Sequence, residues 1–335
     1  MEHVSTLAGV WLPLVISFVV AVALGRPVIA GLQAMGLQTF HWRKTEIDNS
    51  LFYELHQKKI GTPSMGGVLM VGVTSVLLPV MVHAVWVGVF LTCFLLFALL
   101  GLADDISKLL VRAGRRPREL SALPKFLVQW GLALFSGLLL YSVLHLHQLS
   151  LLGCRGCVDL SWGYVIFAAL VLVCCTNAVN IGDGLDGLAG GLFSIAISAL
   201  MVVALWDGHN AVALLAAVVL GPVIGFLVYN IHPAKVVMGD VGSLALGTAL
   251  ALVGLLADNV IGLILVSGVF IVQALSSVIQ ISARRWWGRK VFRIAPLHHN
   301  LEALGWPETR ITTVFWIAGL LCAALAVVLG RLTAS

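Results

Sequence analysis

Five aspartates stand where apolar stretches of this sequence end, and their carboxylates could together hold a divalent cation. They occur in three motifs, "LLGLADDISK" (99–108), "NAVNIGDGLDGLAGG" (177–191) and "VVMGDVGS" (236–243), and are Asp104, Asp105, Asp183, Asp186 and Asp240. Ionisable groups close to a membrane core are costly and usually functional. Mg²⁺ takes one or two carboxylates together with waters and substrate phosphates. The set therefore predicts phosphoryl chemistry on a substrate that is partly lipid.

A simpler explanation is that charges gather wherever helices leave the lipid. It accounts less well for Asp104 beside Asp105, since their like charges repel unless a cation offsets them. It also leaves unexplained the glycines that flank Asp183, Asp186 and Asp240, which allow backbone to approach a ligand closely. Asp183 and Asp186 are three residues apart, so on a helix they would share one face.

Two further motifs could contact phosphate. The stretch "KKIGTPSMGG" (58–67) offers Lys58, Lys59 and hydroxyl groups before an apolar run, although a basic flank with a Thr-Pro turn would look the same. It is not a P-loop, because GxxxxGK[ST] is absent. The stretch "APLHHNLEALGW" (295–306) contains His298 and His299, which could bind phosphate, shuttle protons or ligate metal. An inert surface pair is the alternative, and the nearby aspartate motifs favour function.

Two other stretches have structural interpretations. "RRWWGRK" (284–290) combines basic and aromatic residues as a membrane-interface anchor does, and it is too short to favour nucleic-acid binding. Cys154 and Cys157 in "CRGC" indicate a disulfide or an ordinary loop, because a metal site would need further ligands nearby.

The composition indicates that residues 1–335 form a single integral membrane domain. The chain is 60% hydrophobic and 10% charged, whereas soluble domains are about 25% charged, and its mean hydropathy is +1.04. About 20 apolar residues span a bilayer as a helix, and these runs lack the alternation of barrel strands. We therefore expect an all-α polytopic membrane protein. The first run lacks the basic flank of a signal peptide and exceeds its usual apolar length of about 7–15 residues.

Ten transmembrane helices are expected. The second and third are difficult to separate, because Pro79 and His83 indicate either a tight turn or one kinked span. The expected ranges are 9–33, 65–82, 84–102, 125–145, 163–179, 188–206, 210–229, 241–257, 260–282 and 312–331.

The distribution of basic residues predicts the orientation. Sixteen of the 20 lysines and arginines fall in the five loops on one side, 34–64, 103–124, 180–187, 230–240 and 283–311. Basic residues concentrate in cytoplasmic loops. We therefore expect these loops and the aspartate motifs to face the cytoplasm and both termini to face outward.

In these motifs the chain resembles the phospho-N-acetylmuramoyl-pentapeptide transferases, a branch of the polyprenyl-phosphate sugar-1-phosphate transferases. The resemblance rests on five segments that occur in the family's order between about residues 55 and 310: "GTPSMGG", "GLADDISK", "NAVNIGDGLDGLAGG", "NIHPAKVVMGDVGSLALG" and "APLHHNLEALGWPE". The histidine-containing last segment is similar to the muramoyl-pentapeptide branch rather than the N-acetylglucosamine branch.

The resemblance implies a ten-helix, usually dimeric protein of the bacterial inner (cytoplasmic) membrane, with a cytoplasmic-facing active-site cleft and Mg²⁺ as cofactor. It also implies a reaction in peptidoglycan synthesis. Phospho-N-acetylmuramoyl-pentapeptide would pass from UDP-N-acetylmuramoyl-pentapeptide to undecaprenyl phosphate, giving lipid I and UMP.

The family's functional residues can be carried over position by position. Asp240 matches the Mg²⁺ ligand, and Asp104 and Asp105 match a catalytic pair near the lipid phosphate, with Asp104 the candidate base. His298 matches the family's first, catalytic histidine. The positions that match the lining of the nucleotide and active site are Lys59, Asn180, Asp183, Asp186, Asn230 and His299.

Three positions depart from the family pattern. Asn300 replaces a third histidine, Val237 replaces an aromatic residue, and Gly182 replaces a threonine. The aromatic position bears on uracil stacking rather than on the reaction.

Two other functions and two reaction routes are left open by the sequence. One function is UDP-N-acetylglucosamine polyprenyl-phosphate 1-phosphate transfer. The other is cation-coupled transport, which is disfavoured because transporter sites lie near the bilayer midplane in paired repeats. The phosphoryl transfer could be direct or could pass through an aspartyl intermediate.

Overall fold

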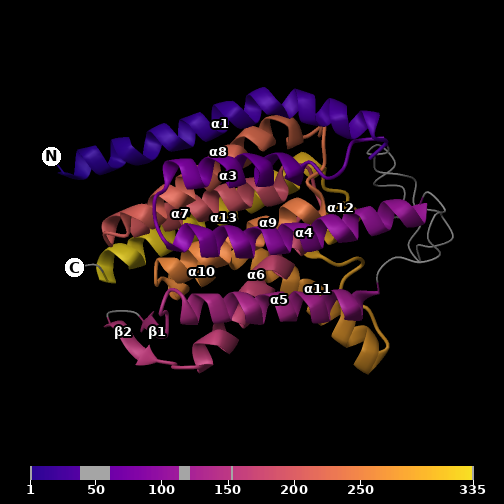
Figure 1. Ribbon diagram of the computed structural model, residues 1–335. Coiled ribbons are helices and arrows are strands. Elements are labelled where there is room, and N and C mark those ends of the chain that lie inside the picture. Colours follow the sequence, from indigo (N-terminus) through magenta and orange to yellow (C-terminus); the bar gives the residue numbers. More distant parts are fainter. Residues whose placement is uncertain (1, 38–60, 113–120, 152–153, 334–335) are drawn as a thin grey trace.

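The computed structural model describes residues 2–37, 61–112, 121–151 and 154–333, with the backbone alone described at 2–8, 112, 151, 154–157 and 333. Figure 1 shows a bundle of helices with one small hairpin. The helices are α1 (Glu2–Ala34), α3 (Gly67–Met81), α4 (Trp86–Arg112), α5 (Ala122–Ser142), α6 (Gly163–Gly182), α7 (Leu188–Trp206), α8 (Asn210–Asn230), α9 (Gly239–Leu256), α10 (Val260–Val266), α11 (Gly268–Trp287), α12 (Leu297–Ala303) and α13 (Glu308–Thr333); the strands are β1 (Gln148–Leu151) and β2 (Cys154–Asp159).

The all-α polytopic class is confirmed. Within the described residues, eight helices are long and apolar enough to span a membrane, and the bent pair α10–α11 makes a ninth. The remaining expected segment is α3, a shorter apolar helix of 15 residues. Helices form here because lipid offers the backbone no hydrogen-bond partners, so each segment must pair its own N–H and C=O groups internally.

Several boundaries differ from those expected. The third predicted helix does not end at 102, because α4 continues to Arg112 and carries Asp104 and Asp105 on the helix itself. The predicted helix 260–282 is broken at Ser267, where α10 and α11 are bent by 69°. The expected loop before α6 is instead an antiparallel hairpin that pairs Gln148 with Asp159.

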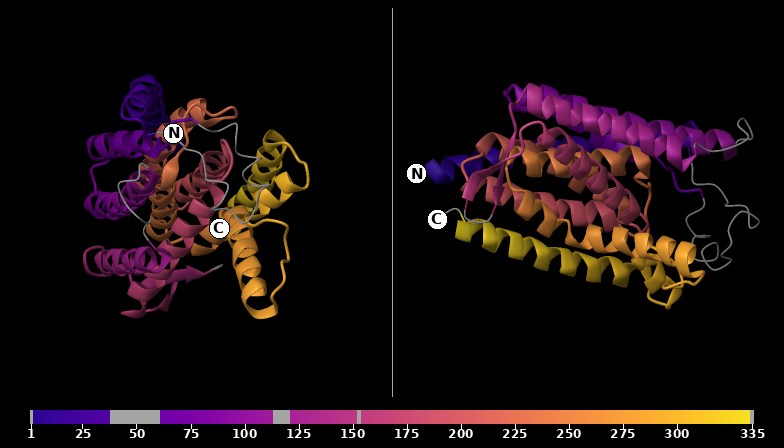
Figure 2. Two further views of the ribbon diagram at one scale, coloured as in Figure 1. Left: turned by 90° about the vertical axis from the view of Figure 1, so that its right-hand side faces the viewer. Right: turned by 90° about the horizontal axis from the view of Figure 1, so that it is seen from below.

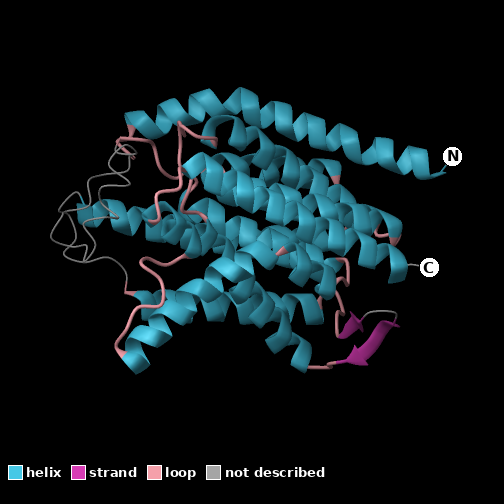
Figure 3. Cartoon of the chain, turned by 180° about the vertical axis from the view of Figure 1, so that it is seen from behind, coloured by secondary structure: helices cyan, strands magenta, loops and turns pink. Residues whose placement is uncertain are grey.

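The two ends of the bundle differ. Both termini and the β1–β2 hairpin lie at one end, and α12 lies at the other (Figures 1 and 3). This arrangement matches the grouping of loops expected from the basic residues. Which end faces the cytoplasm stays a prediction.

Helix α9 is the buried centre of the bundle. Every residue from Val241 to Leu255 is buried, and α9 contacts α3, α4, α6, α7 and α8. Small residues allow such close approach where lipid supplies no hydrophobic driving force between helices. At Gly101 of α4, a Cβ would lie 2.2 Å from the carbonyl oxygen of Asp240. This close contact holds the aspartates of α4 beside the start of α9.

Helix α11 buries polar residues and exposes apolar ones, the reverse of a surface helix in a soluble protein. Its buried face carries Gln273, Ser276 and Gln280, whereas apolar residues such as Val272 and Ile279 are exposed. Its second half projects away from the other helices (Figure 2). The outward apolar face suits lipid, and the inward polar face is available to hold the segment that follows.

Candidate active site

Two aspartates from different helices share two lysines at one end of the bundle. Asp104 of α4 and Asp240 of α9 each contact the ammonium groups of Lys108 and Lys125 through Oδ2. The four N···O distances lie between 2.7 and 2.9 Å. Asp104 is buried, and the Asp240 side chain is 14% exposed. The structure therefore brings together carboxylates that are far apart in sequence and surrounds them with positive charge.

The second oxygen of Asp240 faces α6. Asn180 Nδ2 donates to Asp240 Oδ1 at 3.0 Å and to Ser243 Oγ at 2.8 Å. Asn180 lies in the last turn of α6, three residues before Asp183. It therefore connects the aspartate–lysine cluster to the turn that carries the other two predicted acids.

Asp105 has a different environment from its neighbour. Its Oδ2 accepts a hydrogen bond at 3.0 Å from the backbone N–H of Val241, in the first turn of α9. An acid at a helix N-terminus is stabilised by the exposed N–H groups and the helix dipole. Asp105 thus anchors α4 to α9, while Asp104 faces the lysines.

Asp183 and Asp186 lie in the loop expected between two apolar helices, so they do not share a helical face. Helix α6 ends at Gly182, and residues 183–187 form a turn before α7 begins at Leu188. Asp183 caps α6 and is partly exposed, whereas Asp186 is buried. A run of glycines between two apolar helices favours such a turn, because glycine weakens helices and tolerates a positive φ, as at Gly187 (φ 72°).

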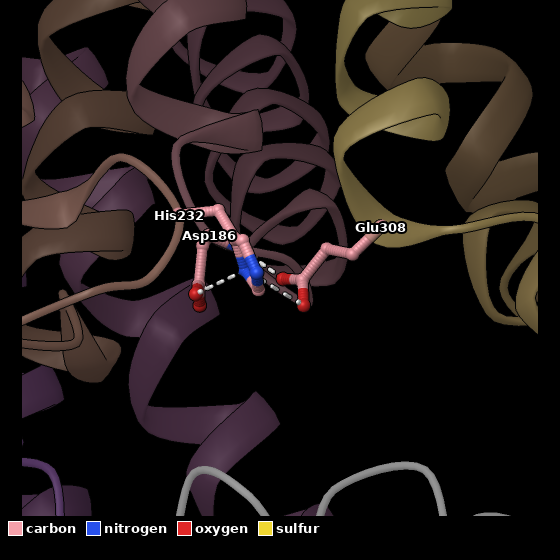
Figure 4. A group of neighbouring side chains, drawn as sticks. All are labelled: Asp186, His232 and Glu308. Atoms are coloured by element: carbon pink, nitrogen blue, oxygen red, sulfur yellow. Dashed lines mark hydrogen bonds and ion pairs between the residues drawn. The ribbon is translucent and has the colours of Figure 1, made fainter.

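Asp186 belongs to a group of three side chains drawn in Figure 4. Its Oδ2 lies 3.1 Å from His232 Nδ1, and Glu308 Oε2 lies 3.5 Å from the same nitrogen. Asp186 Oδ2 also accepts from the backbone N–H of Ala234 at 3.0 Å, and the N–H of Asp186 donates to Glu308 Oε1. The group joins the 183–187 turn, the segment after α8 and the start of α13.

Asn230 supports the same turn through backbone contacts. Its Oδ1 accepts from the N–H of Gly187 at 3.0 Å, and its Nδ2 donates to the carbonyl of Val236 at 2.9 Å. The side chain is buried. This geometry gives Asn230 a positioning role, and its predicted contact with substrate stays a prediction.

The two histidines lie beside the 183–187 turn. Both are buried on α12, and their ring centroids are 4.1 Å apart. A Cβ at Gly184 would lie 2.2 Å from His298 Nε2 and 3.0 Å from His299 Nε2. Both rings therefore present Nε2 to this glycine and neither lies on the surface, while their functional role stays a prediction.

The opposite ring nitrogens are held by neighbouring polar side chains. His298 Nδ1 lies 2.6 Å from Gln273 Oε1, and His299 Nδ1 lies 2.6 Å from Glu302 Oε2. Ser276 Oγ accepts from the N–H of Leu297, and Gln280 Oε1 accepts from two backbone N–H groups at 291 and 292. The buried polar face of α11 thus fixes α12 and the orientation of its rings.

Three predicted features lie apart from this site or outside the described residues. Asn300 points toward the preceding segment, where its Oδ1 accepts from the N–H of Arg293 at 3.0 Å. Lys58 and Lys59 lie outside the described residues, and so do the side chains of Cys154 and Cys157.

Comparison of the sequence with known proteins identifies the family to which the chain is similar. Residues 86–258 match the model of glycosyl transferase family 4. Similar curated proteins, all called phospho-N-acetylmuramoyl-pentapeptide-transferase, include those of Geobacillus kaustophilus (40% identical over 288 residues, 81% of this chain and 85% of the relative) and Geobacillus thermodenitrificans (39% over 283 residues, with the same shares). The protein of Halalkalibacterium halodurans is 36% identical over 332 residues, 95% of this chain and 96% of the relative.

The chain belongs to the phospho-N-acetylmuramoyl-pentapeptide transferase family. The resemblance inferred from the motifs is confirmed, and this family is favoured over the N-acetylglucosamine branch and over a transporter. The matched segment runs from α4 to the end of α9 and so includes Asp104, Asp105, Asn180 and Asp240.

The Mg²⁺ implied by the family can be tested against the residues that would hold it. Asp240 and Asp104 present carboxylate oxygens to one region, and the two ammonium groups there are equal in charge to one divalent ion. Oxygen donors at that position suit Mg²⁺. The group of Asp186, His232 and Glu308 has ligand atoms within 4.8 Å of one another but offers a ring nitrogen, which suits Mg²⁺ less well. The residues around Asp240 therefore fit the ion.

Several residues that contact the candidate site were not singled out from the sequence. They are Lys108, Lys125, His232, Gln273 and Glu308. Two carried a usable signal: Lys108 follows Asp104 by four residues, the spacing of a helical ion pair, and Lys125 is the only charge in α5. The others pair with partners that only the packing of α11, α12 and α13 brings close.

Proposed function

We propose that this protein transfers phospho-N-acetylmuramoyl-pentapeptide from UDP-N-acetylmuramoyl-pentapeptide to undecaprenyl phosphate, giving lipid I and UMP. The observation that carries the proposal is the aspartate–lysine cluster of Asp104, Asp240, Lys108 and Lys125 at one end of a membrane bundle. Family membership supports the same reaction. An oxygen of the acceptor phosphate attacks the β-phosphorus of the UDP-sugar, the bond from that phosphorus to the bridging oxygen breaks, and UMP carries that oxygen away.

The two lysines can offset the repulsion between the phosphate groups of the two substrates. Two phosphate-bearing substrates repel each other, and Lys108 and Lys125 can exchange their carboxylate partners for phosphate oxygens. Positioning and charge stabilisation supply most of the catalysis in phosphoryl transfer. Lysine is a compact charge with rotatable donors and so can follow a phosphate as it moves.

The acidic residues have different roles toward the acceptor phosphate and the nucleotide. Asp240, together with Asp104, would hold Mg²⁺, which when bound supplies Lewis-acid neutralisation of phosphate oxygens. Asp104 orients or deprotonates the acceptor phosphate. Asn180 and the 183–187 turn take the nucleotide side, with Lys59, Asp183, Asp186 and Asn230.

His298 and His299 complete the nucleotide side. Each has Nδ1 held by a side-chain oxygen, which leaves Nε2 directed to Gly184. Donation from Nδ1 to that oxygen makes Nε2 the acceptor of a neutral ring. A protonated ring would instead donate from Nε2 to a phosphate oxygen of the nucleotide.

The protein lies in the bacterial inner membrane, with the candidate site in a cleft on the cytoplasmic side where the UDP-sugar is found, and it acts as a homodimer. No nucleic acid is a partner.

The deciding experiment is a UMP-release assay on the purified chain in detergent. We expect UMP from UDP-N-acetylmuramoyl-pentapeptide only when both polyprenyl phosphate and Mg²⁺ are present. UDP-N-acetylglucosamine should neither be consumed nor compete at equal concentration. Release of UMP from UDP-N-acetylglucosamine instead would transfer the proposal to the other branch of the superfamily.

A further inference from the structure

A cavity of about 510 Å³ lies on the α1 side of the same end of the bundle. It is separate from the aspartate–lysine cluster, which is built by α4, α5, α6 and α9. Its walls come from α1, the segment before α3, the end of α8 and the segment after it. The lining residues are Arg26, Ile29, Ala30, Gln33, Gly61, Thr62, Pro63, Tyr229, Ala234 and Lys235.

Tyr229 fixes the shape of this cavity. Its hydroxyl donates to the carbonyl of Val22 at 2.7 Å, and its ring fills the space that a Cβ at Gly25 would occupy, 2.1 Å away. The N–H of Lys235 donates to the carbonyl of Tyr229 at 2.8 Å. One buried side chain therefore holds α1 and the Lys235 segment in place, so that Arg26 of α1 and Lys235 of the segment after α8 line the same cavity.

The segment 61–63 closes a third side. The N–H of Val237 donates to the carbonyl of Pro63 at 2.8 Å, which ties this segment to the one that carries Lys235. Backbone hydrogen bonds of this kind make the cavity a built feature rather than a gap between loosely placed loops.

Both charged residues that line the cavity are basic. Arg26 is the only charged residue in the candidate span Gly9–Ala34. Among the residues that the structure describes, neither Arg26 nor Lys235 has a carboxylate within ion-pair distance. A charge within a membrane span is costly unless it is paired or reaches the polar boundary. The cavity thus has positive charge that the described part of the protein does not neutralise.

The depth of Arg26 suits the membrane boundary. The span of 26 residues is about 39 Å long at 1.5 Å per residue, whereas the hydrocarbon core is about 30 Å thick. Arg26 lies eight residues before the end of α1, so its side chain can reach the headgroup level. Ile29, Ala30 and Pro63 add an apolar wall beside the basic groups.

We propose that this cavity binds the phosphate of an anionic membrane lipid, with Arg26 and Lys235 on the phosphate and the apolar wall on the glycerol region. Basic pockets between membrane helices at this level suit such headgroups. The inference goes beyond the transfer reaction, since it assigns a lipid that is neither substrate nor product. A nucleotide phosphate has the same chemistry, and the experiment separates the two sources.

The test measures lipid binding to the full-length chain in detergent, without turnover. Short-chain phosphatidylglycerol and phosphatidylcholine of equal chain length are titrated, with thermal melting and native mass spectrometry as readouts. We expect the parent to bind phosphatidylglycerol about tenfold more tightly and to be stabilised by it. Arg26→Gln with Lys235→Gln should remove this preference. Arg289→Gln with Lys290→Gln, a matched loss of two exposed basic residues outside the cavity, should keep it.

Two outcomes would overturn the proposal. One is equal binding of the two lipids by the parent, or a preference that survives in the double variant. The other is weaker UMP binding in the double variant while the lipid preference persists, which would assign the cavity to the nucleotide. If the double variant fails to fold, Lys235→Gln alone, in a segment between helices, gives the same comparison. Failure of the transfer reaction itself would leave these binding results unchanged.

Discussion

The backbone N–H of Asp186 donates to the carboxylate of Glu308, 122 residues further along the chain, with an N···O distance of 2.5 Å. This contact ties the turn between α6 and α7 to the first residue of α13. The turn carries Asp183 and Asp186 and touches both histidines. Its position therefore depends on residues that do not themselves reach the aspartate–lysine cluster.

We expect Glu308→Ala to misplace this turn. The substitution leaves the N–H of Asp186 without its acceptor, a loss of about 1–3 kcal/mol for a buried group. The kcat/KM for the UDP-sugar in the UMP-release assay should fall by about tenfold or more, mainly through KM. Glu308→Gln should recover most of the loss, because its side-chain oxygen can still accept. Thr309→Ala, at the exposed next residue, is the control and should behave as the parent. Equal activity of Glu308→Ala and the parent would contradict the positioning role of Glu308.

A methyl group at Gly184 should separate the turn from the histidines. In Gly184→Ala the new Cβ would lie 2.2 Å from His298 Nε2, so turn and ring cannot both keep their places. We expect turnover to fall by about 100-fold, a cost of about 2.7 kcal/mol in the barrier. Gly88→Ala, on α4 with open space around it, should behave as the parent. Parent-like turnover by Gly184→Ala would show that the histidines are not needed next to the turn.

Replacement of Asp240 should remove both metal binding and catalysis. Asp240→Asn keeps the shape but places a neutral amide between two ammonium groups. We expect turnover to fall by about 100-fold or more, and Mn²⁺ binding, followed by electron paramagnetic resonance as a substitute for Mg²⁺, to weaken. Asp258→Asn is the control, since Asp258 lies beside the hairpin and bonds to Ser150. Normal Mn²⁺ binding by a folded Asp240→Asn protein would reject the metal assignment.

The loss of Asp104 should affect the acceptor rather than the nucleotide. Asp104 contacts Lys108 and Lys125, whereas Asn180, which leads to the nucleotide turn, contacts Asp240. Asp104→Asn should therefore lose catalysis while it still binds UMP, measured by isothermal calorimetry in the presence of Mg²⁺. Loss of UMP binding instead would move Asp104 to the nucleotide side.

The position that lacks the third histidine should tolerate one. Asn300 contacts the N–H of Arg293 and is partly exposed, whereas His298 is buried beside Gly184. Asn300→His should keep turnover within about tenfold of the parent, or about 1.4 kcal/mol of barrier. His298→Ala should cost far more, with folding checked by thermal melting. An active His298→Ala enzyme would leave the ring with only a packing role.

Much of the fold was predictable because hydropathy is a local property. Each of the ten expected apolar segments contains a helix, since lipid leaves the backbone no alternative. Boundaries were less predictable where charge enters a helix. Asp104 and Lys108 were expected in a loop, but α4 continues through them because Asp104 pairs with Lys125 of α5 and Lys108 pairs with Asp240 of α9.

The sequence by itself determined the membrane class, the family and the positions of the acidic motifs, because each depends on residues close together in the chain. Only the tertiary structure decided which charges share one site. Lys125 meets Asp240 across 115 residues, and Gln273 meets His298 across 25. It also decided that the turn carrying Asp186, which was expected as a loop, is held by Glu308. Such contacts follow from how closely the helices pack around α9, which is a property of the whole bundle and has no local signal in the chain.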